Sequence, residues 1–484
     1  MADVFPDASA PSTVTLDDLS PDQSAALDAV YRWYCKVIAN SALPEFCAEE
    51  EHFPYPHTHG FSHGLDQVFA VGGLAGSGKT TIARLLGQRL GTDLIAYGTP
   101  THRAARILAR KLDPEQARAV RTYHALTYFA RVTHYCSLTT LTVREKEGAA
   151  CTCGADEARS CECPKQFEPC AQHALAEPAL TPLCLVKESL TFERRAYLGG
   201  YRHLIVVDEA SMLTASQVED VCAFGVPVLL IGDHGQLPPV KDVMNPWMSN
   251  PDVVLTQNHR QSDTTGIIDL ALAARAGRKL AHGPHGDGST LVMDLNHPHA
   301  LSLLDPQRFV PGPERVVICW TNKQRAAVNQ AFHGNGPIRE GDRVVALSTH
   351  EPDIVELLAN SVRPTGRCAF VANGMVGTVR RVLKSTLKIA DLVIDLDDEP
   401  TPQHGVLVRV AVEQLGAETQ MAYNAKPNGT VLWDYAYAIT AHKAQGGEYD
   451  DVIVIDQNPF DRQRWMYTAI TRARRRLVVI EWHR

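Results

Sequence analysis

Short apolar runs recur along the chain, and each is followed by a Gly-rich or polar turn and then by a stretch with helical spacing. The runs are rich in β-branched residues and do not alternate with polar ones, which is typical of strands buried on both faces of a parallel sheet. Strands separated by helices predict α/β units. The runs are Val68–Val71, Leu204–Val207, Val228–Ile231, Val316–Cys319, Val452–Ile455 and Leu477–Ile480.

A predicted helix precedes this alternation of strands and helices, and two segments interrupt it. The sequence SPDQ at residues 20–23 is a capping box with proline at the first helical position, so a helix is predicted from there. Residues 1–19 are polar and Pro- and Asp-rich, and we expect a disordered tail. Residues 133–190 have no sustained period and predict an insertion. Residues 341–436 predict an all-β insert, with strand-like segments at Arg343–Leu347, Met375–Val382, Leu392–Leu396 and Val406–Val412.

A glycine-rich turn follows the first run. Residues 73–80 read GLAGSGKT and match G-x-x-x-x-G-K-[ST] in full. Its glycines let backbone N–H groups close around phosphate oxygens at a helix N-terminus. Lys79 would reach the β- and γ-phosphates, and the Thr80 hydroxyl would ligate Mg²⁺. The residues assigned to the nucleotide are Gly73, Gly76, Ser77, Gly78, Lys79, Thr80 and Thr81.

Two acidic residues end the run at 204–207. Asp208 would hold Mg²⁺ through a hard carboxylate oxygen. Glu209 would orient and deprotonate the attacking water. An isolated pair of this kind would more simply be an acidic strand end facing solvent. Downstream of a phosphate loop, the pair predicts a nucleoside triphosphatase.

An ordered set of further motifs resembles the superfamily 1 helicases. Residues 232–239, GDHGQLPP, are similar to motif III of that superfamily in every fixed position. Residues 437–448 resemble motif V and residues 467–474 motif VI. The HKAQG form of motif V is similar to the RecD and Dda branch, which translocates 5′→3′ on single-stranded DNA. Residues 257–261 resemble the Arg-bearing motif, and residues 320–329 resemble the T-N segment that ends at a second asparagine, here Asn329. Two likenesses are weaker alone: residues 98–105 resemble motif Ia, and residues 122–126 resemble the T-I-H segment, with Tyr in place of Ile.

The resemblance implies roles for individual residues. Gln236 would sense the γ-phosphate, and Arg260 and Arg472 would be arginine fingers from the second core domain. Gln23 would read the adenine edge, although the capping box alone also predicts this residue. Glu448 would contact the ribose. The resemblance further implies a set of residues that line the single-strand cleft: Pro100, Thr101, His124, Asn322, Thr440, His442 and Lys443. For each polar residue of this set, local capping or a hydrogen bond in the core is an equal alternative.

The resemblance also implies an architecture. The fold class is α/β, with two RecA-like P-loop NTPase domains at 20–250 and 251–484. The first would carry a Cys-rich insert at 127–195, and the second an SH3-like β insert at 341–436. An ordinary β decoration is the alternative for the second insert.

Cysteines concentrate in the first insert, where seven of the chain's 12 fall between Cys136 and Cys184. Thiolates and an imidazole at this density predict structural zinc, although only Cys170 and His173 have a usual ligand spacing. Disulfides and an iron–sulfur cluster are the alternatives. The candidate ligands are Cys151, Cys153, Cys161, Cys163, Cys170 and His173. The RecD and Dda branch places its duplex-splitting pin at this point of the chain, so we hypothesise that the insert forms or supports that wedge.

Charge and composition limit the alternatives. The net charge of −8 excludes a uniformly basic nucleic-acid coat, but not a local basic track. Residues 102–131 carry seven Lys and Arg against two Asp and Glu, and residues 462–476 hold six arginines; a solvated helix face is the alternative for each. Four histidines within 52–63 are better read as a solvated loop than as metal ligands. No window approaches the roughly 18 apolar residues of a membrane span and no secretory signal is present, so we expect a cytosolic protein, in the host cytoplasm if a phage encodes it.

These features together predict a monomeric ATP- and Mg²⁺-dependent DNA helicase acting on single-stranded and forked DNA. Replication or recombination proteins are the candidate partners. An RNA or RNA–DNA helicase is the first alternative, because the sequence does not identify residues that would contact a 2′-hydroxyl. A nucleotide-gated recruitment factor that binds DNA without unwinding it is the second. The full set of Glu209, Gln236, Arg260 and Arg472 argues against an inactive switch.

Overall fold

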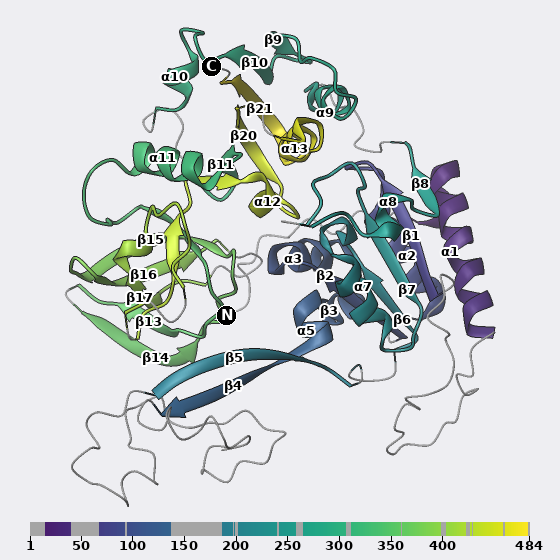
Figure 1. Ribbon diagram of the computed structural model, residues 1–484, viewed down its shortest axis with the longest axis horizontal. Coiled ribbons are helices and arrows are strands. Elements are labelled where there is room, and N and C mark those ends of the chain that lie inside the picture. Colours follow the sequence, from purple (N-terminus) through teal and green to yellow (C-terminus); the bar gives the residue numbers. More distant parts are fainter. Residues whose placement is uncertain are drawn as a thin grey trace, which may run out of the picture. The chain divides into compact units, whose positions relative to one another are not determined.

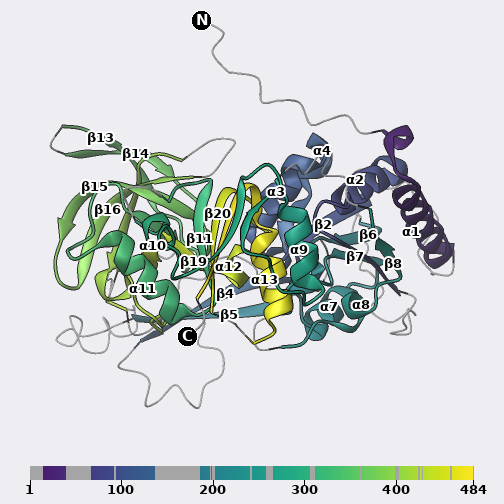
Figure 2. The same ribbon diagram turned by 90° about the horizontal axis from the view of Figure 1, so that it is seen from above.

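The computed structural model describes most of the chain (Figures 1 and 2). The residues described are 15–39, 67–91, 94–136, 186–196, 198, 202–239, 242–257, 265–305, 311–359, 361–397, 403–422, 426–427, 429–457 and 460–482. They fall into two compact units: residues up to 123 together with those from 201 onward form the first, and residues 124–200 form the second.

The first unit contains a six-stranded parallel sheet in the order β3-β2-β6-β7-β1-β8. Helices α2 and α3 lie on one side of it and α7 and α8 on the other (Figure 2). The predicted strands 68–71, 204–207 and 228–231 are its central members, because their β-branched side chains are buried on both faces. Its elements are α1 (Pro21–Ala39), β1 (Val68–Gly73), α2 (Lys79–Leu90), β2 (Ile95–Thr99), α3 (His102–Lys111), α4 (Pro114–Arg118), β3 (Val120–Thr122), β6 (Leu204–Val207), a 3₁₀ turn (Ala210–Met212), α7 (Ala215–Cys222), β7 (Val228–Gly232), α8 (Pro246–Ser249) and β8 (Val253–Leu255).

A second six-stranded sheet follows in the order β19-β11-β20-β21-β10-β9, parallel except for the β9–β10 pair. The predicted strands 316–319, 452–455 and 477–480 lie in β11, β20 and β21. Helices α9 and α13 pack against each other beside this sheet (Figures 1 and 2). Its elements are α9 (Ile267–Arg275), β9 (Gly283–His285), β10 (Thr290–Asp294), α10 (Ala300–Leu303), β11 (Arg315–Cys319), α11 (Asn322–His333), β19 (Ala438–Thr440), α12 (Ala441–Ala444), β20 (Tyr449–Asp456), α13 (Arg462–Ile470) and β21 (Ala473–Glu481). The predicted α/β class, with parallel sheets typical of RecA-like domains, is confirmed.

Between α11 and β19 the chain forms a seven-stranded sheet whose neighbouring strands are all antiparallel. Four of its strands, β12, β15, β16 and β17, overlap the predicted segments. The strands β13, β14 and β18 were not predicted, because they are short or mostly exposed and carry little apolar periodicity. The SH3-like identity of the insert stays a prediction. Its elements are β12 (Arg343–Ala346), β13 (Asp353–Leu357), β14 (Val362–Cys368), β15 (Val376–Ser385), β16 (Ile389–Leu396), β17 (Val406–Ala411), a 3₁₀ turn (Val412–Gln414) and β18 (Trp433–Tyr435).

The second unit is described as a short helix and a two-stranded antiparallel ribbon. Helix α5 (Tyr123–Thr127) leads into β4 (Tyr128–Cys136), which pairs with β5 (Val186–Arg194) from Tyr128 opposite Arg194 to Cys136 opposite Val186. The sequence predicted an insertion at 133–190 but neither of these strands, which overlap both ends of that range. A two-stranded ribbon has no second sheet to impose an alternating pattern, so its strands gave no periodic signal.

The predicted N-terminal tail also needs a correction. Leu16–Asp18 form a 3₁₀ turn, and the Asp18 carboxylate accepts hydrogen bonds from the backbone N–H and the hydroxyl of Thr15 at 2.7 and 2.8 Å. Residues 1–14 of the predicted tail lie outside the described residues. Among the helices that the structure describes, none combines the length and apolarity needed to cross a membrane.

Candidate nucleotide and nucleic-acid site

The loop between β1 and α2 has a geometry that only glycine satisfies at two positions. Gly76 and Gly78 have φ values of +81° and +84°. A Cβ atom at Gly78 would also lie 1.9 Å from Nε2 of Gln23. Lys79 lies over the loop and donates from Nζ to the carbonyls of Gly73 at 2.9 Å and Leu74 at 2.7 Å.

This loop has the chemistry of a phosphate site. Its backbone amides precede helix α2, where the helix dipole favours an anion. The Ser77 hydroxyl is fully buried and has no hydrogen-bond partner among the described residues, so it is a polar group left over by the fold. The loop therefore fits the phosphates of a nucleotide.

The acidic pair lies at the end of β6. The Thr80 hydroxyl is 3.5 Å from Oδ2 of Asp208, and these two hard oxygens fit adjacent ligands of one Mg²⁺ ion. Glu209 has a left-handed backbone with φ of +56°, unusual for a residue with a side chain, and its N–H donates to Oδ1 of Asp208 at 2.9 Å. Burial raises the pKa of both carboxyls, and the charge of Asp208 raises the pKa of Glu209 further. A carboxylate with a raised pKa is suited to accept a proton from water.

Gln236 follows β7 on the loop at residues 232–239. Its side chain is buried, and its backbone N–H donates to the carbonyl of Asp233 at 3.1 Å. The Oε1 atom has no hydrogen-bond partner in the described part of the chain. A buried acceptor of this kind costs about 1–3 kcal/mol when unpaired, as is typical of a group kept for a ligand or a moving partner.

The second sheet contributes Arg472, which follows helix α13. Its buried guanidinium donates to the carbonyl of Thr468 at 3.0 Å, to the carbonyl of Gly447 at 3.1 Å and to the Thr471 hydroxyl at 3.1 Å. Its positive charge opposes the rise in the pKa of Glu209, so the two groups interact electrostatically. The other predicted arginine finger, Arg260, lies outside the described residues.

The two residues predicted at the adenosine have identifiable contacts. Gln23 closes the capping box of α1: Ser20 N–H donates to its Oε1 at 3.1 Å, and its own N–H donates to the Ser20 hydroxyl at 3.4 Å. Its Nε2 also donates to the carbonyl of Ser77 at 3.1 Å. Glu448 lies 3.9 Å from the ammonium of Lys111 and leads into β20. The capping alternative for Gln23 is confirmed, and the adenine and ribose roles stay predictions.

The predicted cleft residues are held by local contacts. Thr101 follows Pro100 and caps α3 by accepting from Ala104 N–H at 3.1 Å, whereas Thr440 occupies the N-cap of α12 without a side-chain capping bond. Burial lowers the pKa of His442 and of the Lys443 ammonium that follows it. Thr101 and motif V approach closely, since a Cβ at Gly446 would lie 3.4 Å from the Thr101 hydroxyl oxygen.

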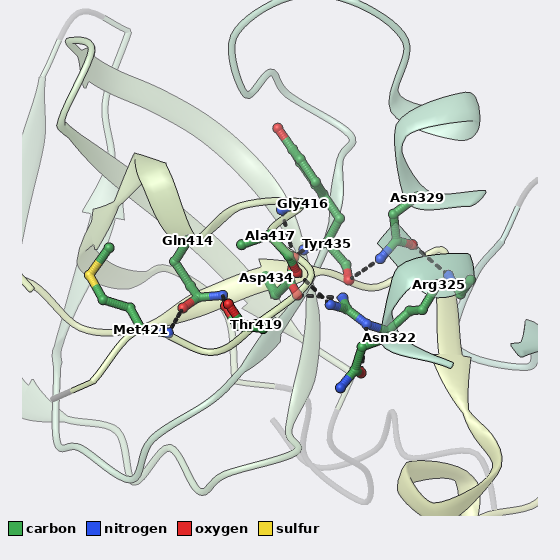
Figure 3. Close-up of polar contacts among 11 residues, drawn as sticks. Asn322, Arg325, Asn329, Gln414, Gly416, Ala417, Thr419, Met421, Asp434 and Tyr435 are labelled. Carbon is green, nitrogen blue, oxygen red and sulfur yellow. Dashed lines mark hydrogen bonds and ion pairs between the residues drawn. The ribbon is translucent and has the colours of Figure 1, made fainter. Parts of the chain in front are cut away.

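The remaining two cleft candidates differ in setting. His124 belongs to the second compact unit, where its ring centroid lies 5.9 Å from that of Tyr128 and burial lowers its pKa. Asn322 begins α11 in the first unit and accepts from Nε of Arg325 at 3.3 Å (Figure 3). Neither contact tests a role in nucleic-acid binding, which stays a prediction.

Two polar residues of α11, to which the sequence assigned no role, connect this helix to the segments around it. Arg325 forms a buried ion pair with Asp434 and donates to the carbonyl of Ala417 at 2.6 Å (Figure 3). Asn329 joins α11 to the last strand of the β insert and to the strand that follows it: its Nδ2 donates to the carbonyl of Tyr435 in β18 at 3.0 Å, and its Oδ1 accepts from the N–H of Ala438 in β19 at 2.7 Å. The positions of Arg325 and Asn329 within the helicase-like segment at 320–329 were the available signal.

Contacts between the two parallel sheets involve further residues. Arg103 of α3 stacks over the ring of Tyr449, with 4.1 Å from its Cζ to the ring centroid, and donates to the carbonyl of Glu448 at 3.3 Å. Tyr467 of α13 donates to Asp233 and accepts from the N–H of Ala75. No sequence pattern identifies these pairs, because their partners are far apart along the chain.

The predicted zinc ligands, Cys151, Cys153, Cys161, Cys163, Cys170 and His173, all lie outside the described residues, as do the four histidines at 52–63. Within the part of the chain that is described, no group of three or more His, Cys, Asp or Glu side chains could hold a metal ion. The zinc prediction is therefore neither supported nor contradicted at its own residues.

Two family profiles match this chain. Residues 61–288 match the AAA domain, and residues 435–480 match the UvrD-like helicase C-terminal domain. The second match contains motifs V and VI in the second sheet. The chain is 28% identical over 310 residues to the ATP-dependent RecD2 DNA helicase of Deinococcus radiodurans. With these matches, the chain is similar to the RecD-like superfamily 1 helicases.

The match to that RecD2 protein covers 57% of this chain but only 37% of the relative, so this chain spans well under half of the protein it resembles. Solved structures are also similar. A Pif1 helicase studied at forked double-stranded DNA has a TM-score of 0.45 at 15% identity, with 95% of this chain and 92% of that chain covered. Pif1 helicase from Candida albicans has a TM-score of 0.43 at 13% identity, with 96% and 95% covered. With TM-scores below 0.5, these likenesses add nothing to the assignment.

Proposed function

We propose that this protein is an ATP- and Mg²⁺-dependent DNA helicase that moves 5′→3′ along single-stranded DNA and unwinds duplex. The observation that carries the proposal is the contact between the loop at residues 232–239 and the second sheet. Leu237 N–H donates to the Thr468 hydroxyl at 3.0 Å, and its carbonyl accepts from Nε2 of Gln445 at 3.0 Å. A loop that carries the buried Gln236 is thus bonded to motif V and to motif VI at once.

This arrangement supports the coupling of hydrolysis to movement. The phosphate loop and the acidic pair belong to the first sheet, whereas Arg472 and the residues bonded to Leu237 belong to the second. A nucleotide contacted by both would favour their closed arrangement, and hydrolysis would remove that preference. Basic side chains of α3, which begins beside Thr101, could hold the phosphates of a single strand without regard to its sequence.

Each group at the nucleotide site would have a distinct task. Lys79 and the loop amides would bind the phosphates, and Glu209 would take the proton of the attacking water. Arg472 would offset negative charge on the transferring phosphoryl group. Thr80 and Asp208 would hold Mg²⁺, which supplies charge neutralisation at the phosphate oxygens when bound.

We further propose, from the sequence alone, that the Cys-rich segment binds structural zinc. Elemental analysis of the purified protein by mass spectrometry, with a parallel assay for iron and acid-labile sulfide, tests this. One or two zinc ions per chain is the expected result. Detection of iron together with sulfide would contradict zinc and indicate an iron–sulfur cluster. Absence of both zinc and iron would contradict a metal site in this segment.

Unwinding of matched 5′-tailed and 3′-tailed DNA duplexes, with ATP hydrolysis measured alongside, tests the helicase. We expect strand displacement of the 5′-tailed substrate only, and a Lys79→Met variant that hydrolyses ATP about 100- to 1,000-fold more slowly. Lys384→Met, which changes an exposed lysine of β15, is the matched control and should behave as the wild type. DNA-stimulated hydrolysis without displacement of either substrate would favour the recruitment factor. Displacement of RNA duplexes alone would favour the RNA helicase.

A further inference from the structure

The Tyr467 hydroxyl connects two loops that follow strands of the first sheet, although Tyr467 itself lies on helix α13, beside the second sheet. It donates a hydrogen bond to Oδ2 of Asp233 at 2.5 Å and accepts one from the N–H of Ala75 at 3.2 Å. Ala75 lies in the phosphate loop, and Asp233 lies on the loop that carries Gln236. One oxygen atom of α13 therefore touches both loops.

The surroundings of Asp233 keep this contact fixed. Its carboxylate is 1% exposed, accepts from Gly235 N–H at 2.9 Å and lies 3.8 Å from the guanidinium of Arg275. Arg275 also lies 2.6 Å from Nε2 of His234, whose pKa is lowered by burial and by the arginine charge. A neutral His234 can accept a hydrogen bond from the Arg275 guanidinium. The positive charge of Arg275 is therefore balanced by the Asp233 carboxylate and not opposed by a charged imidazole.

The protonation of Tyr467 is also defined. Burial and the charge of Asp233 both raise the pKa of this phenol, so the hydroxyl remains a donor at every physiological pH. A hydrogen bond from a neutral donor to a buried carboxylate is among the stronger ones in proteins. The geometry and the charges therefore agree on the direction of the bond.

Packing alone does not require this hydroxyl. Tyr97 of β2 is a second fully buried tyrosine, and its hydroxyl has no hydrogen-bond partner among the described residues. The fold thus tolerates a buried phenol that makes no bond, and a phenylalanine would fill the same space. At Tyr467 the hydroxyl makes two bonds, each to a loop of the proposed nucleotide site.

We propose that Tyr467 is a positioning residue that transmits the arrangement of the phosphate loop to the Gln236 loop. A shift of the Ala75 amide must change its bond to the Tyr467 oxygen, and that oxygen is bonded to Asp233. The carbonyl of Asp233 accepts from Gln236 N–H at 3.1 Å, so the path ends at the residue implied in γ-phosphate sensing. This inference rests on the proposed function, because it takes residues 73–80 as the ATP site.

The test begins with Tyr467→Phe, which removes only the hydroxyl. We expect kcat for DNA-stimulated ATP hydrolysis to fall about tenfold, which corresponds to about 1.4 kcal/mol, while KM for ATP changes less than twofold. Tyr97→Phe is the matched control, and it should leave both constants unchanged. Thermal unfolding of both variants checks that each is folded. An unaltered kcat in folded Tyr467→Phe would overturn the inference.

A double-mutant cycle with Asp233→Asn identifies the partner. If the two side chains act through their bond, the double variant should hydrolyse ATP about as slowly as the slower single variant. Additive losses would show that they act separately and would overturn the inference. The cycle needs hydrolysis alone. A wild-type protein that hydrolyses ATP without unwinding would therefore contradict the helicase proposal and leave the role of Tyr467 to be decided by the cycle.

Discussion

The guanidinium of Arg325 and the carboxylate of Asp434 form an ion pair with only 6% and 2% of the two side chains exposed. The pair joins helix α11, which follows strand β11 of the second sheet, to β18, the last strand of the β insert. Asp434 also accepts from the N–H groups of Gly416 and Tyr435, both at 2.7 Å (Figure 3). A charge buried this deeply needs its partner, because removal of one member leaves the other without compensation.

Arg325→Met should therefore lower the free energy of unfolding by about 3–5 kcal/mol, measured by chemical denaturation. Arg409→Met is the matched control. It breaks the pair with Asp391, whose members are 55% and 19% exposed, and should cost about 1 kcal/mol or less. Equal effects of the two changes would contradict the importance that we give to burial.

Gln23 has two separable roles that one substitution can distinguish. Gln23→Glu keeps an oxygen that can accept from Ser20 N–H but loses the donor to the Ser77 carbonyl and places a negative charge beside the phosphate loop. We expect KM for ATP to rise about tenfold. The adenine role further predicts that the preference for ATP over GTP, measured as the ratio of kcat/KM values, falls.

The control for Gln23 is Gln217→Glu. Gln217 completes a second capping box, in which Thr214 N–H donates to its Oε1 at 3.0 Å, at the start of α7. The same change there should alter KM less than twofold. A rise in KM for Gln23→Glu with an unchanged ATP-to-GTP ratio would refute adenine reading while leaving the loop contact intact.

Glu209 predicts a specific pH dependence of hydrolysis. Burial and Asp208 raise the pKa of this group above the ordinary value of 4.5. The base must be deprotonated to act, so kcat/KM should fall as the pH drops through a value above 4.5, and should be independent of this group at higher pH. Because the two acids interact, the apparent pKa belongs to the Asp208–Glu209 pair.

Glu209→Gln should lower kcat by about 100- to 10,000-fold without loss of ATP binding. Glu219→Gln, which changes an exposed carboxylate of α7, should retain wild-type hydrolysis. Full turnover in the Glu209 variant would exclude it as the base. An acid limb at or below the ordinary glutamate value would contradict the raised pKa.

The β4–β5 ribbon allows a clean test of the wedge hypothesis. Cys136 and Val186 are paired, so an Asn-Gly turn in place of residues 137–185 can close the ribbon as a two-residue hairpin. If the removed segment forms or supports the wedge, the shortened protein should retain DNA-stimulated ATP hydrolysis and lose strand displacement. Unwinding at the wild-type rate would refute the hypothesis. Circular dichroism provides the check on folding.

The sequence predicted the elements whose signals are local. The strand at 204–207 has the predicted bounds, because each of its residues is apolar and buried in the centre of a sheet. Helix α1 begins at Pro21, directly after the capping residue Ser20. Such features follow from residues within a few positions of each other, which a single sequence displays.

The contacts that organise the site could not be predicted in this way. Asp233 and Tyr467 are 234 positions apart, and Arg325 and Asp434 are 109 positions apart. Each of these side chains would be unremarkable on a solvated surface, and only the folded chain makes it a buried partner. Resemblance to a family named several of the motifs involved but gave no partner for any of these four residues.

The first and last strands of the β insert, β12 and β18, pair with each other, with Val344 opposite Tyr435 and Ala346 opposite Trp433. The insert thus leaves and rejoins the second sheet at neighbouring points, so almost its whole length is one cassette between α11 and β19. Such a cassette can be lengthened, shortened or exchanged over evolutionary time without moving the strands that flank it. Related chains should therefore differ in length here far more than in the two parallel sheets.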